Sequence, residues 1–412
     1  MALVVQKYGG SSVATKDLIE SVARRAVATK RAGHQVVVVL SAMKGETDRL
    51  LNLAHSISET PSPREVDTLI STGEQITIAL FSMICSTMGE KVKSFLGFQA
   101  GIKTDDAHTR ARIMDIDASR IKTELAKNRI AVVAGFQGIN RHGDITTLGR
   151  GGSDTTAVAL AIALKAKVCE IYTDVDGIYT TDPNICDSAR RIDKICYDEM
   201  LELASLGAKV MEIRSVELAM NYGVRIHVRH ALTQSPGTII CEEDADMERT
   251  PVRGVTSSVQ EGRITLLKVP DKPGVAARIL EIISKAGIVI DMIIQNQSFS
   301  SNGDDNIWTD FSFTVPASDY KTTLDLMTAA GKEIGASKVV GDNNIAKVSL
   351  VGVGMRNHAG VATLMFKTLA SEGINICMIS TSEIKISCII EKKYAELAVR
   401  ALHIAFNLGA PV

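Results

Sequence analysis

Apolar and polar positions divide the chain into two halves with different patterns. Up to about residue 240, short and almost wholly apolar runs alternate with stretches of helical periodicity, such as residues 18–32 and 158–165. The apolar runs predict buried strands, and the periodic stretches predict helices. Strands this apolar, separated by helices, indicate a mostly parallel sheet that is covered on both faces. The clearest strand-like runs are residues 36–40, 130–134, 169–173 and 225–228.

The C-terminal half contains an internal repeat with an offset of 86 residues. Gly274-Val275-Ala276 recurs as Gly360-Val361-Ala362, and Gly287-Ile288-Val289-Ile290 recurs as Gly373-Ile374-Asn375-Ile376. An apolar helical face follows the first glycine of each copy, so each copy predicts a strand, a loop, a helix, a glycine stop and a strand. This arrangement is similar to paired ACT domains, small βαββαβ units that bind amino acids. A duplicated module with a purely structural role is the alternative.

Composition favours a soluble metabolic enzyme. The 412 residues carry 46 Lys and Arg against 47 Asp and Glu, and only 4% are aromatic. A net charge of −1 favours neither a nucleic acid nor an anionic membrane as a partner. The seven cysteines form no Cys-x-x-Cys pair, so we expect free thiols in a reducing cytosol. We find no secretory signal and no apolar run of the roughly 18 residues that span a bilayer, and we expect a cytoplasmic protein.

A glycine-rich loop at residues 148–154 is the most informative motif. It contains Arg150 between glycines and leads into a helix, with Asp154 or Thr155 placed to cap it. Glycines let backbone N–H groups crowd around an anion, and a helix N-terminus adds about half a positive charge. An arginine adds a planar fork that grips a carboxylate or a phosphate. The loop is therefore expected to hold an anionic small molecule; the alternative is a strand-to-helix turn with an incidental arginine.

Two further loops carry similar chemistry. Lys7 lies at the end of the first predicted strand, beside Gly9 and Gly10, where a lysine and a glycine nest can meet a transferring phosphoryl group. Neither a Walker A loop nor a Gly-x-Gly-x-x-Gly fingerprint is present. The acidic loop at 173–183 fails as an EF-hand, because its glycine comes too early, but suits the rim of a nucleotide site. All three loops are expected to meet at the carboxyl ends of the strands.

Taken together, these motifs resemble the aspartokinase family. The resemblance implies ATP-dependent phosphorylation of the side-chain carboxylate of L-aspartate to 4-phospho-L-aspartate. That reaction is the first step toward lysine (through diaminopimelate), threonine and methionine. A monofunctional enzyme is expected, since no extension resembles homoserine dehydrogenase. The motifs, in the family's order, are Lys7-x-Gly9-Gly10-Ser11-Ser12, Ser41-Ala42-Met43, Ser71-Thr72-Gly73-Glu74, residues 147–154, Thr173-Asp174-Val175-Asp176-Gly177 and Gly207-Ala208-Lys209-Val210-Met211.

The resemblance also gives the expected fold and domain division. We expect an α/β domain of the amino-acid-kinase type at residues 1–241, with a mostly parallel sheet sandwiched by helices. Charge and a proline then interrupt the pattern and indicate an interdomain linker at 242–262. Two ferredoxin-like βαββαβ (ACT) units are expected at 263–342 and 343–412.

Roles for individual residues follow from the resemblance. Lys7 would neutralise the transferring phosphoryl group, Glu74 would bind the α-ammonium group of aspartate, and Asp154 would orient Lys7 or its partners. Arg150 would clamp the α-carboxylate. Hydrogen-bonding neighbours of aspartate would be Ser41, Thr47 and Ser153. The residues expected to hold ATP are Lys7, Tyr8, Gly9, Gly10, Thr173, Asp174, Tyr179, Thr180, Thr181, Asp182, Pro183, Asn184 and Lys209.

The chemistry needs little beyond positioning and charge neutralisation. A carboxylate nucleophile is ionised at pH 7, so no general base is required. Mg²⁺ is expected with ATP, and no dedicated protein metal site is predicted. Two alternatives stay open: a sister kinase acting on N-acetylglutamate, glutamate or UMP, and a non-catalytic amino-acid sensor. The Glu74 motif and the C-terminal repeat argue against the first, and the presence of Lys7, Arg150 and Asp154 argues against the second.

The ACT units predict feedback regulation. Each loop delivers backbone N–H groups at a helix N-terminus, which suits the α-carboxylate of an amino acid. The two loops differ, which suggests two effectors, and pathway logic points to the end products lysine and threonine acting together. The expected effector-binding residues are Asp271, Lys272, Pro273, Gly274, Val275, Ala276, Val289, Ile290, Asp291 and Gln295 in the first unit, and Val361, Ala362, Asn375, Ile376, Ser382 and Glu383 in the second.

Assembly is the last expectation. ACT units commonly pair edge to edge, so we expect a homodimer or a larger homo-oligomer formed through them. Met247 opens the C-terminal module after the charged segment and could serve as an internal start. A shorter regulatory chain starting near Met247 would then be a second partner.

Overall fold

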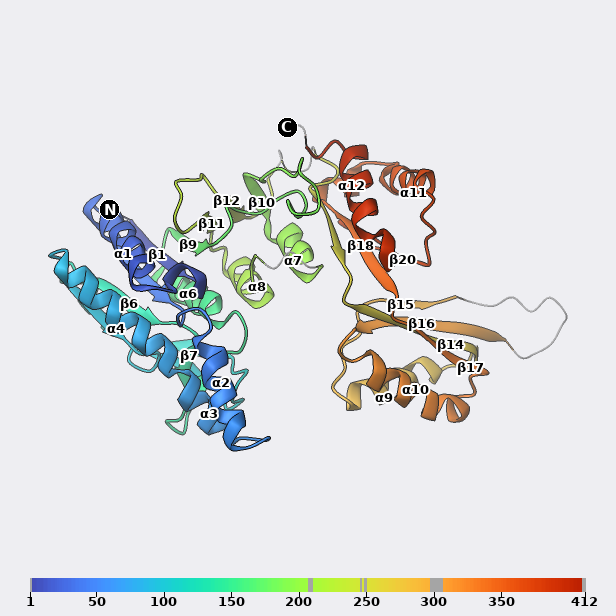
Figure 1. Cartoon of the computed structure of the whole chain (residues 1–412), viewed down its shortest axis with the longest axis horizontal. Coiled ribbons are helices and arrows are strands. Elements are labelled where there is room, and N and C mark those ends of the chain that lie inside the picture. The colour runs from blue at the N-terminus through green and yellow to red at the C-terminus, as the bar shows by residue number, and fades with distance from the viewer. Residues whose placement is uncertain (1, 207–209, 245–246, 248–249, 297–306, 410–412) are drawn as a thin grey trace. The chain divides into compact units, whose positions relative to one another are not determined.

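In the computed structural model the chain folds into two compact units (Figure 1). The residues that the structure describes are 2–206, 210–244, 247, 250–296 and 307–409. The N-terminal unit comprises residues 1–179 and 191–247, and the C-terminal unit comprises residues 180–190 and 248–412.

An eight-stranded sheet forms the core of the N-terminal unit. Its order is β10-β12-β11-β9-β1-β2-β6-β3, and among these neighbours only β11 and β12 are antiparallel. The central strands β2 and β6 are buried at nearly every position, as predicted from their apolar sequences. The strands are β1 (Leu3–Tyr8), β2 (Gln35–Leu40), β3 (Val92–Phe95), β6 (Ile130–Ala134), β9 (Val168–Thr173), β10 (Lys194–Cys196), β11 (Ile226–His230) and β12 (Thr238–Cys241).

Helices cover both faces of this sheet. Successive side chains of a strand point to opposite faces. Along β2, Val36, Val38 and Leu40 join an apolar cluster with α1 and α4, while Val37 and Val39 are equally buried on the other face, where α6 contacts β1 and β2. The helices are α1 (Lys16–Arg31), α2 (Glu46–Ile57), α3 (Pro63–Ile70), α4 (Thr72–Thr87), α5 (Ser119–Ala126), α6 (Gly152–Leu164), α7 (Tyr197–Ser205) and α8 (Ile213–Tyr222).

A second, four-stranded sheet in the N-terminal unit leads the chain into the glycine-rich loop. Its order is β5-β4-β7-β8, and β8 ends at Thr147, directly before that loop. The strands are β4 (Ile102–Thr104), β5 (Ile113–Ile116), β7 (Gln137–Ile139) and β8 (Ile145–Thr147).

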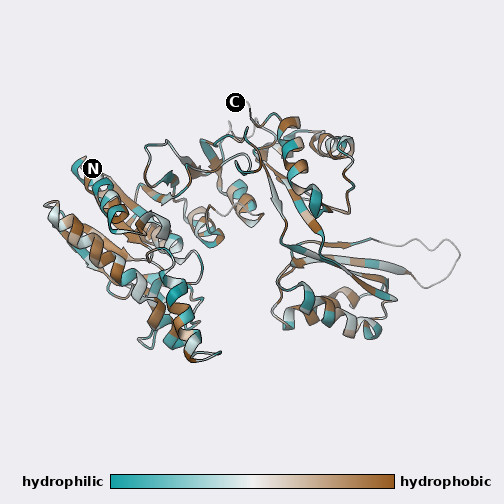
Figure 2. Cartoon of the chain, in the orientation of Figure 1, coloured by the Kyte–Doolittle hydropathy of each residue, from teal (hydrophilic) through white to brown (hydrophobic). Residues whose placement is uncertain are grey.

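Residues 63–87, which form α3 and α4, are long and apolar enough to cross a membrane by length and composition. From the sequence we expected no apolar run long enough to span a bilayer. Within it, Ile78, Phe81 and Cys85 are buried against α1 and the central sheet. Figure 2 shows many hydrophobic residues, in brown, along α4. We therefore interpret the stretch as a core helix pair.

The C-terminal unit contains two antiparallel sheets, each packed against two helices. In the first sheet the order is β15-β16-β14-β17, with α9 and α10 packed on it; in the second it is β13-β18-β20-β19, with α11 and α12. The elements are β13 (Gly254–Ser258), β14 (Glu261–Pro270), α9 (Val275–Lys285), β15 (Ile293–Gln295), β16 (Trp308–Pro316), α10 (Tyr320–Ile334), β17 (Lys338–Asp342), β18 (Ile345–Val351), α11 (Val361–Ser371), β19 (Met378–Thr381), β20 (Lys385–Glu391) and α12 (Ala395–Ala405).

The internal repeat predicted from the sequence is present in the structure. Helices α9 and α11 have 11 residues each and begin 86 positions apart. Their N-caps, Gly274 and Gly360, have φ angles of 94° and 96°, a left-handed conformation that glycine adopts without steric cost. The two copies therefore repeat down to the backbone conformation at the start of the helix.

The second sheet takes one strand from before the first repeat. β13 lies within residues 242–262, the segment expected to be a linker, and it pairs antiparallel with β18. In the first sheet the corresponding place beside β14 is filled by β17, which follows its own helix α10. The segment expected to be a linker thus supplies the fourth strand of the second sheet. Along the chain, the whole first sheet with its two helices lies between this strand and the other three strands of the second sheet.

Candidate active site

A cavity of about 330 Å³ lies in the N-terminal unit, at the carboxyl ends of β1 and β2 and the start of α6. Parallel α/β sheets bind ligands at this edge. The cavity brings together most of the residues predicted for aspartate and phosphoryl binding, from segments far apart in the sequence. Its lining residues are Lys7, Gly9, Gly10, Ser41, Ala42, Met43, Lys44, Gly45, Thr47, Asp48, Glu74, Phe136, Gly151, Gly152, Ser153 and Asp154.

Lys7 and Asp154 form an ion pair at this cavity. The distance from Lys7 Nζ to Asp154 Oδ1 is 2.6 Å, and both side chains are largely buried. Helix α6 begins at Gly152 with Gly151 as its N-cap, so neither Asp154 nor Thr155 caps the helix as expected. Asp154 instead lies in the first turn, where the helix dipole favours a carboxylate. The pair thus holds the lysine ammonium group at the N-terminus of α6.

Glu74 is a buried carboxylate with an incomplete set of partners. Its residue is only 3% exposed, and its Oε1 accepts a hydrogen bond of 3.0 Å from the Ala42 backbone N–H. Among the described residues its Oε2 has no hydrogen-bond partner. Burial raises the pKa of Glu74 to about 8, although the backbone hydrogen bonds oppose this shift. A cation entering the cavity would satisfy this carboxylate and favour its ionised form.

Close packing brings the segments of Gly10 and Gly73 against Ala42, which follows β2, at the cavity. A Cβ atom on Gly10 would lie 2.9 Å from the Ala42 carbonyl oxygen, and one on Gly73 would lie 2.8 Å from Ala42 Cβ. Both distances are too short for a larger residue. Gly10 and Gly73 therefore allow Ala42 to approach closely enough to donate to Glu74.

Arg150 does not line the cavity. It is exposed, at a turn between Gly149 and Gly151, whose φ angles are 76° and 69°. Gly151, its neighbour, does line the cavity. The structure therefore places the turn at the site, and the expected contact of the Arg150 guanidinium with a carboxylate stays a prediction.

The residues predicted for ATP are only partly brought together. Tyr8 is fully buried and stacks on Tyr172, with ring centroids 4.6 Å apart, so its side chain belongs to the core. Thr173 is the last residue of β9, and its hydroxyl donates a hydrogen bond of 3.1 Å to Asp174, the next residue. Tyr179 forms a β-bridge with Arg191. Lys209, also predicted for ATP, lies outside the described residues.

The predicted ATP residues Thr180 to Asn184 belong to the C-terminal unit. Thr180 and Thr181 are buried, while Asp182, Pro183 and Asn184 are exposed. His403 of α12 is buried between two residues of the 180–190 segment: its Nε2 lies 2.9 Å from Thr180 Oγ1, and its Nδ1 lies 3.4 Å from Ser188 Oγ. Sequence inspection gave no signal for this attachment, because residues 180 and 403 are far apart in the chain.

The predicted effector-binding residues lie around the N-termini of α9 and α11 and in the segments that follow these helices, next to β15 and β19. Most are exposed or half-buried. In the first unit, Gln295 Nε2 donates to Asp271 Oδ1 at 3.5 Å. In the second unit, Glu383 is 3.4 Å from Arg356 Nε. Asp291 is bound within the protein by Lys347, which sequence inspection missed.

Lys347 is a buried lysine in the C-terminal unit. It is 3% exposed and pairs with Glu261, at 3.0 Å, and with Asp291. Burial by itself lowers the pKa of Lys347, but hydrogen bonds and charges from Asp291 and Glu261 outweigh burial and raise it. One of the predicted effector carboxylates is thus engaged with a lysine of the second sheet.

Other features of the described residues carry no predicted chemistry. No group of three or more His, Cys, Asp or Glu residues could hold a metal ion in the described part of the chain. All seven cysteines are free thiols, and only Cys377 is exposed. A larger cavity of about 740 Å³, lined by β5, α6 and α8, contains none of the residues expected to bind ligands.

Similarity to known proteins agrees with this architecture. Residues 2–230 match the amino acid kinase family, and residues 263–328 and 348–406 match ACT domains. An aspartokinase of Pseudomonas aeruginosa is 54% identical over 413 residues, covering 100% of this chain and 99% of that protein. This chain belongs to the aspartokinase family. The aspartokinase of Corynebacterium glutamicum is 46% identical, covering 99% of this chain and 97% of that protein.

Solved aspartokinase structures share the fold. Escherichia coli aspartokinase III in complex with aspartate and ADP has a TM-score of 0.78 and 26% identity, covering 98% of this chain and 99% of that one. The same enzyme in complex with lysine and aspartate has a TM-score of 0.75 and 27% identity. The expected fold, with an amino acid kinase domain followed by ACT domains, is confirmed. The expected activity is confirmed as well: this chain phosphorylates the side-chain carboxylate of L-aspartate with ATP.

Proposed function

We propose that the cavity around Glu74 is where L-aspartate binds and where its side-chain carboxylate attacks the γ-phosphoryl group of ATP. The observation that carries this proposal is the buried Glu74 carboxylate, one oxygen of which has no partner among the described residues. The α-ammonium group of aspartate satisfies that oxygen and restores the ionised form. An N-acetylated amino acid or a nucleotide offers no such cation, so the cavity favours a free amino acid.

Lys7, held by Asp154, neutralises charge on the transferring phosphoryl group. Electrostatic stabilisation of this kind needs donors fixed in advance, and the 2.6 Å ion pair fixes the ammonium group at the N-terminus of α6. Gly9 and Gly10 line the same cavity, and because the Gly9 N–H donates to the Tyr172 carbonyl at 3.3 Å, we assign the contact with a phosphate oxygen to the Gly10 amide. Ser41, Thr47 and Ser153 provide hydroxyl groups around aspartate, and Arg150 clamps its α-carboxylate.

Thr173, Asp174, Tyr179, the 180–184 segment and Lys209 hold ATP in this proposal. Mg²⁺, which accompanies ATP, would stabilise the charge of its phosphates during transfer. The described residues offer no cage of three or more carboxylate, histidine or cysteine ligands. With no such group of protein ligands among the described residues, the site fits a Mg²⁺ ion that is held mainly by the ATP phosphates and keeps several of its water molecules.

An ADP-release assay with alternative acceptors tests substrate choice. L-Aspartate, N-acetylglutamate, glutamate and UMP are supplied in turn with ATP and Mg²⁺. Release of ADP that depends on L-aspartate, with none above background for the other three, is the expected result. Faster turnover of N-acetylglutamate would contradict the role given to Glu74.

For regulation, we propose that lysine and threonine bind at the two ACT units and inhibit together. Support comes from the duplicated helix starts at Gly274 and Gly360, whose flanking loops differ. Escherichia coli aspartokinase III has been solved with lysine. Lysine plus threonine should inhibit more than either alone, and Asp271→Ala should relieve inhibition without changing uninhibited kcat. Activity unchanged by both at millimolar concentration would leave the ACT units as assembly elements.

We further propose a cytoplasmic homo-oligomer assembled through the ACT units. A shorter regulatory chain starting near Met247 is the second partner, and the boundary between the two compact units falls directly after this residue. Native mass spectrometry distinguishes the possibilities. A single 44.2 kDa species would exclude both the oligomer and the shorter chain.

A further inference from the structure

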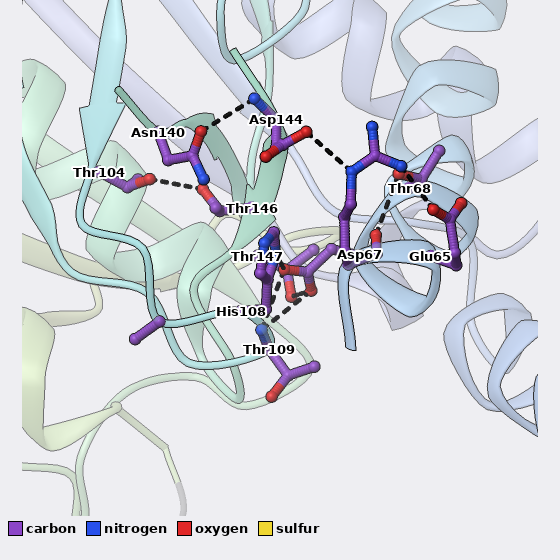
Figure 3. A network of polar contacts seen from close by, with 12 residues as sticks. Glu65, Asp67, Thr68, Thr104, His108, Thr109, Asn140, Asp144, Thr146 and Thr147 are labelled. Carbon is purple, nitrogen blue, oxygen red and sulfur yellow. Dashed lines mark hydrogen bonds and ion pairs between the residues drawn. The ribbon is translucent and has the colours of Figure 1, made fainter. Parts of the chain in front are cut away.

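Asp67 of α3 is a completely buried carboxylate with no part in the roles described so far (Figure 3). Its Oδ1 accepts a short hydrogen bond of 2.5 Å from Thr147 Oγ1, and its Oδ2 lies 2.8 Å from His108 Nδ1. Both oxygens also accept from the Thr109 backbone N–H, at 3.1 and 3.0 Å. A buried carboxylate is retained only when its hydrogen bonds compensate for lost hydration, and here both oxygens are satisfied.

One of these partners holds an unfavourable backbone conformation. Thr109 has a φ angle of 67°, in the left-handed region that a β-branched residue rarely adopts. Such strain persists only where the surroundings enforce it, and it is concentrated near functional sites. The two hydrogen bonds from the Thr109 N–H to Asp67 enforce it here.

The strained residue lies against the glycine-rich turn. A Cβ atom on Gly149 would lie 3.1 Å from the Thr109 carbonyl oxygen, so this carbonyl packs directly on the backbone that precedes Arg150. The Ala111 N–H donates to the Thr147 carbonyl at 2.9 Å. Residues 108–111 and 147–149 are thus joined side by side, and Asp67 binds both segments.

A second link strengthens this junction from the other side. The guanidinium group of Arg214 on α8 donates to the Leu148 carbonyl at 2.8 Å and to the Ala111 carbonyl at 3.1 Å. The backbone on the N-terminal side of Arg150 is therefore fixed on two sides. On the C-terminal side, Gly151 and Gly152 pass directly into α6, which carries Asp154.

We propose that Asp67 is a positioning residue for aspartate binding. It acts through Thr109 and Thr147 and sets the conformation of the turn that presents Arg150 to the substrate. The inference rests on the proposed function of Arg150 as the clamp of the α-carboxylate. Asp67 is fully buried and both of its oxygens are engaged within the protein, so it is assigned no direct contact with the substrate. Asp67 instead influences the orientation of the Arg150 guanidinium group. A small displacement of such a positioned group has a large kinetic effect.

Asp67→Asn is the main test. The substitution keeps the size of the side chain but replaces one accepting oxygen with an NH₂ donor, which opposes the Thr109 N–H or the Thr147 hydroxyl. The KM for aspartate should rise about tenfold, while the KM for ATP and kcat stay within about twofold. A thermal shift without a change in the KM for aspartate would mean a purely structural role and would overturn the inference.

Two neighbouring threonines on β8 provide a matched pair if Asp67→Asn fails to fold. Thr146 and Thr147 are both fully buried and both hydrogen-bonded through their hydroxyls, but only Thr147 binds Asp67; Thr146 pairs with Thr104 at 2.6 Å. Thr147→Val should raise the KM for aspartate about threefold, and Thr146→Val should leave it unchanged. Equal kinetic effects of the two variants would contradict the proposal.

A double-mutant cycle with Arg150→Lys separates this inference from the function on which it rests. If Asp67 acts through Arg150, the KM for aspartate of the double variant Asp67→Asn, Arg150→Lys will rise by less than the product of the two single-variant rises. If Arg150→Lys alone leaves that KM unchanged, the clamp itself is wrong. If Arg150→Lys raises it and Asp67→Asn does not, the clamp holds and the positioning role is refuted.

Discussion

Asp67 and Glu74 lie seven residues apart and are both buried carboxylates, but their surroundings differ in how completely they satisfy the hydrogen-bonding capacity of the two groups. Asp67 accepts hydrogen bonds at both oxygens from side-chain and backbone donors. Glu74 accepts one from the Ala42 backbone N–H, lines a cavity, has no hydrogen-bond partner for its other oxygen among the described residues, and has its pKa raised to about 8 by burial. A buried carboxylate with all of its hydrogen bonds made holds the surrounding protein in place. A buried carboxylate at a cavity that lacks hydrogen-bond partners is suited to bind a cation.

The same contrast separates two buried ion pairs of the N-terminal unit. Lys7–Asp154 and Lys30–Glu90 have nearly equal distances and nearly equal exposure of their side chains. Lys7 and Asp154 line the cavity, whereas Lys30 and Glu90 do not. Burial and ion pairing by themselves therefore do not identify a functional residue. A position at the cavity is what distinguishes the first pair from the second.

Lys7→Ala should produce the largest effect and tests this second comparison. Removing the ammonium group should lower kcat by on the order of 100- to 1,000-fold, because its charge is needed chiefly in the transition state. Steady-state kinetics with saturating ATP and aspartate measure this. Lys30→Ala, at the matched pair, should change stability and leave kcat within about twofold. A Lys7→Ala enzyme with near-normal kcat would remove Lys7 from the mechanism.

Glu74→Gln should affect aspartate binding and its pH dependence. The KM for aspartate should rise about 10- to 100-fold, as expected for a lost hydrogen bond to a charged group. In the unmodified enzyme this KM should fall as the pH rises from 6 to 8, because the ionised carboxylate binds the ammonium group. The variant should lose that trend. A wild-type KM that is constant over this range would contradict the pKa assigned to Glu74.

The same substitution should stabilise the protein without ligand. The folded-state pKa of Glu74 lies above its ordinary value of 4.5, so the folded chain binds the proton more tightly than the unfolded chain. Glu74 therefore lowers stability increasingly as the pH rises from about 4.5 to about 8, and no further above that. Relative to wild type, Glu74→Gln should gain on the order of 1–3 kcal/mol between pH 5 and pH 8. Urea unfolding at both values measures the gain; no dependence on pH would refute it.

Much of this architecture could be predicted from the chain, because it depends on local patterns. Apolar runs indicate the buried strands, and the carboxyl ends of neighbouring parallel strands lie close together, which brings Lys7 and Ser41 to one cavity. Asp154 reaches this cavity from α6, after the antiparallel strand β8. The 86-residue offset gives α9 and α11 directly. Each of these features follows from residue order and from the direction of the chain.

Features created by contacts between distant residues could not be predicted. Asp67 looks like an ordinary helix carboxylate in the sequence, and its hydrogen-bond partners, residues 108–109 and 147, are far from it along the chain. The pairing of β13 with β18 skips the whole first ACT unit. The side chain of Arg150 is exposed, and no sequence pattern determines its direction.

The smallest expected effect concerns the second ACT unit and its attachment to residues 180–190. His403→Gln should weaken the contacts to Thr180 and Ser188, and thereby loosen the backbone of the proposed ATP residues 180–184. Since a neutral hydrogen bond contributes about 0.5–1.5 kcal/mol, the KM for ATP should rise about three- to tenfold while that for aspartate stays constant. His227→Gln is the matched control: His227 also has its pKa lowered by burial, and its ring bonds the Pro236 carbonyl in the N-terminal unit. An equal rise in the KM for aspartate, or an equal response of the control, would show that His403 supports general stability and not the nucleotide segment.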